Sequence, residues 1–134
     1  MASHQAEERS IAFVDAAGGS LSALAAAVAT SLGVPAVAAT SGAIGGRPAE
    51  IATVLEEVGM RLASAEVAPL KSLEQRALER VVFLGSDPPP ELSQAPRWEV
   101  SLFAGEGELE RLATARIARD RIERAIERLR SEKA

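Results

Sequence analysis

The sequence contains no cysteine, one histidine, one tryptophan and no long apolar run. Without cysteine the chain has no disulfide, no thiolate metal ligand and no cysteine nucleophile. The histidine, His4, lies in a polar N-terminal segment, so we expect neither a histidine-based metal site nor a catalytic triad. No apolar run approaches the ~20 residues that span a bilayer, and the N-terminus lacks the basic-then-apolar order of a signal peptide. These absences predict a cytoplasmic protein with no metal, no cofactor and no membrane contact.

The composition suits one compact domain. The chain has 134 residues, of which 47% are apolar and 25% are charged. This is enough apolar material for a real core. We expect a flexible N-terminal segment over residues 1–10 and a single domain over residues 11–134. The net charge of −4 argues against nucleic acid as a partner, because the phosphate backbone favours a basic surface.

Short apolar segments alternate with helical patterns along the chain. We expect strands over 11–14, 34–39, 81–84 and 98–103, helices over 21–32, 48–58 and 107–130, a short helix from about residue 72, and irregular structure over 60–70. Continuous apolar strands that alternate with helices indicate a parallel sheet with helices on both faces. The sequence therefore predicts an α/β, three-layer αβα fold with a four-stranded parallel sheet in the flavodoxin-like order 2-1-3-4.

The first strand runs directly into a loop of small residues and then into an alanine-rich helix. The positions of this loop are Asp15, Ala16, Ala17, Gly18, Gly19, Ser20, Leu21 and Ser22. A glycine-rich loop before a helix N-terminus can direct backbone N–H groups toward an anion at the carboxyl edge of a parallel sheet. The same residues also fit a purely structural turn, with Ser20 or Ser22 as the helix cap and Gly33 at the end of the helix.

Several short segments follow one another in a recognisable order. They are Phe13-Val14 before the loop, Ser22 at its end, Ala39-Thr40-Ser41-Gly42, Arg47-Pro48-Ala49, Glu57-Val58-Gly59-Met60, Val81-Val82-Phe83-Leu84 and Trp98-Glu99-Val100. In this order, over residues 11–130, they resemble the low-molecular-weight phosphotyrosine phosphatase superfamily, which includes the thioredoxin-coupled arsenate reductases. The resemblance implies the fold of that superfamily, with the loop in the place of its Cys-x5-Arg phosphate loop.

The resemblance also implies which chemistry is missing. Asp15 stands where the family has its nucleophilic Cys, and Leu21 stands where it has the Arg that clamps the phosphoryl oxygens. The general-acid Asp of the family falls near Leu102. A carboxylate ~4 Å from a phosphate charge opposes it by roughly 4 kcal/mol at an effective dielectric constant of ~20. We therefore expect neither cysteine-based phosphoryl transfer nor arsenate reduction.

Two functions follow from these departures. The first is a catalytically inactive phosphatase-fold protein, a pseudoenzyme that acts as a regulatory or interaction module with a protein partner or a second copy of itself. The alternative is a repurposed pocket that binds a small anion or performs carboxylate chemistry through Asp15, with Arg47 and Asp87 as candidates for its rim. Carboxylate chemistry through Asp15 predicts an Asp15 carboxylate open to solvent near a cation. A carboxylate buried by its own loop and bound to backbone N–H groups counts heavily against this chemistry.

Two further features have a structural and a binding interpretation. Trp98 is either a half-buried core residue, which we favour, or an interface anchor. The Arg- and Glu-rich helix over 107–130 either packs within the domain or forms half of a helical dimer. Its apolar stripe is wide enough to cover a sheet face, which favours packing within the domain.

Overall fold

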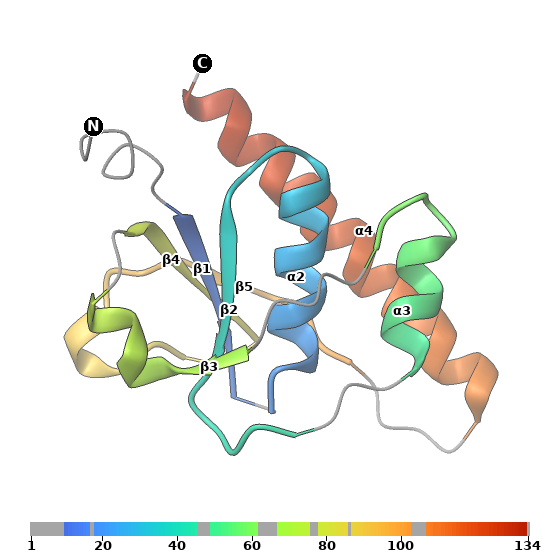
Figure 1. The fold of residues 1–134 in the computed structure, drawn as a ribbon, viewed down its shortest axis with the longest axis horizontal. Helices are drawn as coiled ribbons and strands as arrows, with labels where there is room; N and C mark the ends of the chain where they lie inside the picture. Colours follow the sequence, from blue (N-terminus) through green and yellow to red (C-terminus); the bar gives the residue numbers. More distant parts are fainter. Residues whose placement is uncertain are drawn as a thin grey trace.

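A computed structural model describes residues 10–16, 18–45, 49–61, 67–75, 78–85, 87–102 and 107–133. The elements in chain order are β1 Ser10–Asp15, α2 Ser20–Ser31, β2 Ala36–Thr40, α3 Ala49–Glu56, β3 Val67–Pro69, the 3-10 helix η1 Leu70–Gln75, β4 Leu78–Leu84, the 3-10 helix η2 Pro90–Leu92, β5 Arg97–Trp98 and α4 Glu108–Lys133 (Figure 1). All neighbouring strands are parallel, so their carboxyl ends lie along one edge of the sheet.

The sheet has five strands in the order β3-β2-β1-β4-β5, so the prediction of a four-stranded sheet was wrong. Three expected strands lie in the expected relative order with β5, as β2-β1-β4-β5. The strand expected over 98–103 is corrected, because β5 has only two residues and overlaps that range at Trp98 alone. The additional strand, β3, falls in the segment that was expected to be irregular, and it pairs with β2 through Ala38 and Val67. A strand of three residues that ends in proline is too short to give a periodic pattern, so tertiary pairing decides its structure.

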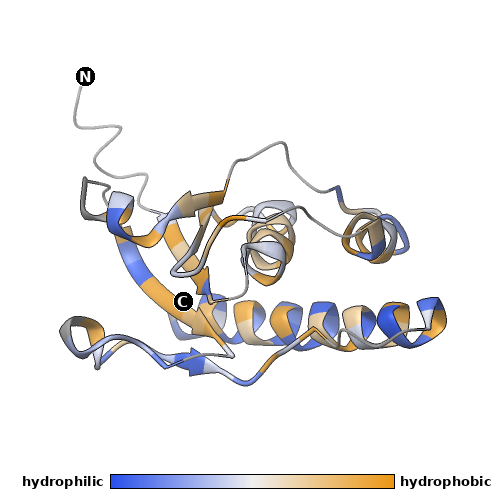
Figure 2. Cartoon of the chain, turned by 90° about the horizontal axis from the view of Figure 1, so that it is seen from below, coloured by the Kyte–Doolittle hydropathy of each residue, from blue (hydrophilic) through white to orange (hydrophobic). Residues whose placement is uncertain are grey.

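The α-helices of the described residues cover one face of the sheet, and the 3-10 helices cover the other (Figures 1 and 2). The first face joins β1 and β4 to α2, α3 and α4 around Phe13, Leu24 and Ile122, all of them fully buried. The second face, with Val14 and Phe83, is covered by Leu73 of η1 and by Leu92. The expected αβα sandwich is therefore corrected, because the helix expected from about residue 72 forms only the short 3-10 helix η1.

Helix α2 is the centre of the helical layer. Its residues from Leu21 to Ala29 are all buried, as expected for an alanine-rich helix that contacts both the sheet and the neighbouring helices. Gly33 has a φ of 83° and ends the helix as predicted, with the Val34 N–H donating to the Ala29 carbonyl at 2.8 Å. The N-terminus of this buried helix lies at the end of the central strand β1, which fixes the position of the loop between them.

The terminal helix α4 packs within the domain, as favoured from its apolar stripe. Ala115, Ala118, Ile122 and Ile126 belong to the same apolar cluster as α2 and α3. Across the part of the chain that the structure describes, no helix combines the length and apolar character needed to cross a membrane.

Candidate functional site

The carboxylate of Asp15, the last residue of β1, turns into the loop that follows the strand. The Gly19 N–H donates to Asp15 Oδ1 at 3.0 Å, and the Ser22 N–H donates to Oδ2 at 2.8 Å. Asp15 is 1% exposed. Ser22 lies in the first turn of α2, so the carboxylate also meets the partial positive charge of a helix N-terminus. Asp15 therefore occupies the anion cradle that its own loop forms.

The cap of α2 differs from the prediction. The residue at the N-cap position is Gly19, which has no side chain, and neither Ser20 nor Ser22 takes this position. The Ser22 hydroxyl instead donates to the Gly19 carbonyl at 3.1 Å. The N–H donors of Gly19 and Ser22 are met by Asp15, four residues before the cap. A carboxylate from the preceding strand thus takes the role expected of a local serine.

Thr40, at the end of β2, holds the other side of the loop. It lies opposite Asp15 in the sheet register and is 1% exposed. Its hydroxyl donates to the Asp15 carbonyl at 3.1 Å and accepts the N–H groups of Gly18 at 3.3 Å and Gly42 at 3.1 Å. Sequence reasoning missed this residue, although the pairing of the two strands could have found it, because the ends of adjacent parallel strands meet at one edge.

The backbone of the loop requires glycine at one position in particular. Gly19 has a φ of 105°, which L side chains rarely adopt. A Cβ atom at Gly19 would also lie 2.7 Å from Cγ1 of Val67 in β3. The added strand β3 therefore packs directly on the loop, and a side chain at this position would push the cradle away from the sheet.

The other predicted site residues lie elsewhere. Leu21 is 6% exposed and belongs to the apolar cluster on the helical face, and Leu102 is half-buried against the same cluster. Asp87 is exposed and forms an ion pair with Arg97 of β5. Ala17 and Arg47 are outside the described residues. The structure thus brings Asp15, Gly19 and Ser22 together, and the side chains at the two positions where the resemblance expects a clamping Arg and a general acid, Leu21 and Leu102, are apolar.

A second carboxylate is strongly bound where α3 meets α4. Hydrogen bonds from Arg116 lower the pKa of Glu57 from 4.5 to about 2. Burial opposes this effect, while the hydrogen bond from Arg119 and the charges of both guanidinium groups add to the lowering of the pKa. Arg119 is 8% exposed, and its Nη1 also donates to the Val54 carbonyl at 2.6 Å. Arg119 therefore binds a free carbonyl in the last turn of α3, which has no basic residue of its own there.

Two other observations limit the chemistry available. The described parts of the chain contain no group of three or more His, Cys, Asp or Glu residues that could hold a metal ion. A cavity of about 890 Å³ lies on the second face of the sheet, bordered by Ser41 and by apolar residues that include Leu70, Leu73 and Val81. The cavity offers an apolar surface, and Lys71 is the charged residue in its lining.

One of three comparisons with known proteins identifies the fold. No protein-family profile matches the sequence, and no curated protein matches it. Solved structures do match. An arsenate reductase in the phosphate-binding state superposes with a TM-score of 0.75 and 18% identity, over 94% of this chain and 99% of that one. The YwlE arginine phosphatase from Geobacillus stearothermophilus superposes with a TM-score of 0.69 and 21% identity, over 92% of each chain. A protein tyrosine phosphatase superposes with a TM-score of 0.69 and 12% identity, over 93% of this chain and 98% of that one.

These matches define the class of the fold. The chain is a parallel α/β domain of the kind found in arsenate reductases and low-molecular-weight tyrosine phosphatases, which confirms the resemblance at the level of the fold. The matched proteins are named as arsenate reductases and as tyrosine or arginine phosphatases. At identities of 10–21%, the likeness to these structures concerns the backbone and assigns no activity to this chain.

Proposed function

We propose that this chain is a non-catalytic, phosphatase-fold protein that acts by binding a protein partner, and that its phosphate-type loop is permanently occupied by Asp15. The observation that carries the proposal is the buried carboxylate bound to the Gly19 and Ser22 N–H groups. An arsenate reductase of the same fold has been described in a phosphate-binding state. In this chain the corresponding donors already have an anion.

The absent groups support the same proposal. The sequence has no cysteine to supply a thiolate, and Leu21 lies in the apolar core where a clamping Arg would stand. A nucleophilic carboxylate must be free to approach phosphorus, whereas both oxygens of Asp15 accept hydrogen bonds from the loop itself. The geometry thus disfavours the alternative of carboxylate chemistry through Asp15.

Thermal denaturation with phosphate, arsenate and sulfate tests the proposal. We expect no shift of Tm for the wild type at millimolar anion concentration, because the cradle is full. Asp15→Ala empties the cradle, so we expect a lower Tm that phosphate or sulfate partly restores. Asp87→Asn is the control, since it removes a carboxylate at the surface.

Two results would overturn the proposal. One is a clear rise of the wild-type Tm with phosphate, which requires a free cradle. The other is hydrolysis of p-nitrophenyl phosphate by the wild type that Asp15→Asn abolishes. The Asn variant has nearly the same shape as the wild-type residue, so it serves where Asp15→Ala does not fold.

A further inference from the structure

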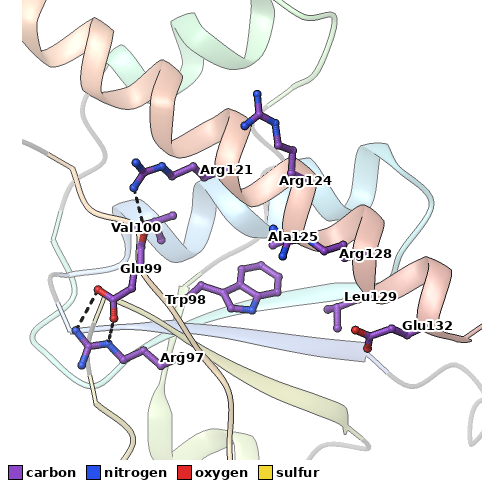
Figure 3. A pocket seen from close by; sticks show the side chains of 10 residues that line it. All are labelled: Arg97, Trp98, Glu99, Val100, Arg121, Arg124, Ala125, Arg128, Leu129 and Glu132. Carbon is purple, nitrogen blue, oxygen red and sulfur yellow. Dashed lines mark hydrogen bonds and ion pairs between the residues drawn. The ribbon is translucent and has the colours of Figure 1, made fainter.

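A groove of about 490 Å³ lies between β5 and the C-terminal half of α4 (Figure 3). One side is formed by residues 97–100, and the other carries Arg121, Arg124 and Arg128 on one stripe of the helix. Each of these three arginines is exposed. The lining carries four arginines and two glutamates, so the groove has a net positive charge on a chain whose net charge is −4.

The arginines that α4 contributes to the groove differ from the other arginines of this helix, and from Arg97 of β5, which pairs with Asp87 and Glu99. Arg111, Arg116, Arg119 and Arg130 each form an ion pair with a carboxylate. Among the described residues, Arg124 and Arg128 have no such partner, and Arg121 donates only to the Glu99 carbonyl at 3.4 Å. Arg111, Arg116 and Arg119 are thus neutralised where α4 packs against α3, and Arg130 pairs with Glu127 of its own helix, whereas Arg124 and Arg128 have no ion pair with the described residues along the groove. Guanidinium groups without a carboxylate partner indicate an anionic ligand.

The edge of the sheet lies beside these arginines. β5 is the last strand of the sheet, and on its outer side no strand of the described residues pairs with it. The bond from Arg121 to the Glu99 carbonyl shows that the helix side chains reach the backbone just beyond this strand. An extended peptide can add main-chain hydrogen bonds at such an edge.

The spacing of the arginines fits an extended chain. Residues 124 and 128 are separated by about 6 Å along a helix that rises 1.5 Å per residue. Alternate residues of an extended strand lie about 6.6 Å apart and point to the same side. Carboxylates on alternate residues of a peptide can therefore meet Arg124 and Arg128 together.

We propose that this groove binds a short acidic segment of a protein partner in extended conformation, with carboxylates on alternate residues. Glu99 and Glu132 in the groove and Asp120, Glu123 and Glu127 on the next stripe of the helix repel any anion, so they limit the attractive surface to the arginine strip. A short segment with few charges therefore fits better than a long polyanion such as nucleic acid. The inference rests on the proposed interaction role and names the chemistry of the partner.

Trp98 provides a direct readout. It is the only tryptophan of the chain, and its ring lies in the groove, 5.7 Å from the ring of Phe13 between centroids. We expect its emission to change saturably when the intact protein is titrated at low salt with the capped peptide Glu-Thr-Glu-Thr-Glu. The Gln-Thr-Gln-Thr-Gln peptide should bind at least about tenfold more weakly, and the isomer Glu-Glu-Glu-Thr-Thr about threefold more weakly.

A pair of matched double variants locates the site. Arg124→Gln with Arg128→Gln should weaken binding of the Glu-Thr peptide about tenfold or more. Arg116→Gln with Arg130→Gln removes the same charge from α4 outside the groove, and we expect affinity within about twofold of the wild type. Loss of affinity in the first pair alone supports the groove.

Several outcomes would overturn the inference. One is an unchanged Trp98 emission up to 1 mM Glu-Thr peptide, which corresponds to about −4 kcal/mol of binding. Another is an equal loss of peptide affinity in both double variants. The others are tighter binding of a short single-stranded oligonucleotide than of the peptide, and dimerisation of the free protein that the groove variants abolish. The anion assays on Asp15 measure the loop, so failure at the groove is separable from failure of the non-catalytic role.

Discussion

Two carboxylates of this chain, Asp15 and Glu57, are each bound by several N–H donors, but the donors are of different kinds. Asp15 is bound by backbone N–H groups of a loop and a helix N-terminus. Glu57 is bound by the guanidinium groups of Arg116 and Arg119, which come from another helix. Backbone donors are fixed by the path of the chain, whereas side-chain donors exist only while both partners are present.

This difference distinguishes a ligand-binding type of site, around Asp15, from a structural contact between helices, around Glu57. The donors around Asp15 belong to the backbone, so we expect them to stay available to another anion when the Asp15 side chain is removed. The donors around Glu57 have no role for a ligand, because Arg119 also binds the Val54 carbonyl and thereby ties α4 to the end of α3. The loop therefore has the architecture of a binding site, and the α3–α4 contact has that of a structural link.

Removal of the backbone-bound carboxylate should have the largest effect. Asp15→Ala leaves buried N–H groups of Gly19 and Ser22 without an acceptor, so we expect a loss of about 3–5 kcal/mol in the free energy of unfolding. Urea denaturation followed by circular dichroism measures it. A loss below about 1 kcal/mol would mean that Asp15 is not the acceptor these donors depend on.

Distortion of the cradle should cost somewhat less. Gly19→Ala places a side chain at positive φ and against Val67, and we expect a loss of about 2–4 kcal/mol. Gly33→Ala is the matched control, since Gly33 also has positive φ but a Cβ there would meet no atom within 4 Å. We expect a loss of about 1 kcal/mol in the free energy of unfolding for this control. Equal losses for the two variants in urea denaturation would show that Val67 does not confine the loop.

Removal of a guanidinium from the α3–α4 contact should have a smaller effect. Arg119→Ala leaves the Val54 carbonyl and the Glu57 carboxylate without this donor, and we expect urea denaturation to show a loss of about 1–3 kcal/mol. Arg116→Ala removes a more exposed partner of the same carboxylate and should destabilise the protein less. A larger loss for Arg116→Ala would contradict the role of Arg119 as the cap of α3.

The smallest effect should come from Glu57 itself, and it should depend on pH. Its pKa is lowered to about 2, so its stabilising contribution is complete above the ordinary pKa of 4.5 and is lost as the pH falls from 4.5 toward 2. Glu57→Gln should lower the Tm at pH 7, while Glu56→Gln, at the exposed neighbouring position, should leave it nearly unchanged. The difference in Tm between the wild type and Glu57→Gln should shrink below pH 4.5. A difference in Tm that stays constant with pH would mean that the ion pair contributes nothing.

Much of the fold could be predicted from the sequence because its elements carry local signals. β1 and α2 are continuous apolar segments separated by a glycine-rich turn, and Gly33 marks the end of the helix. β3 and β5 have only three and two residues and depend on pairing with strands distant in sequence. Such short strands leave no periodicity to read.

The candidate site was only partly predictable. The resemblance placed the loop and identified Asp15 and Leu21 as departures, but it gave no direction for the Asp15 side chain. That direction depends on the positive φ of Gly19 and on the contact with Val67, which is distant in sequence. The hydroxyl of Thr40 and the guanidinium of Arg119 were missed for the same reason, since their partners Asp15 and Val54 lie 25 and 65 positions away.

The carboxylate of Asp15 is attached to the strand that leads into its own cradle, and this attachment favours it over any anion from solution that competes for the same N–H groups. A group on the same chain acts at an effective concentration of millimolar for a loose tether, and of far more for a well-oriented one. A phosphate ion from solution must displace that group and also lose its translational freedom. The residue at position 15 therefore determines whether the N–H groups of the loop are free to bind an anion from solution. We expect that replacing this one side chain makes them free.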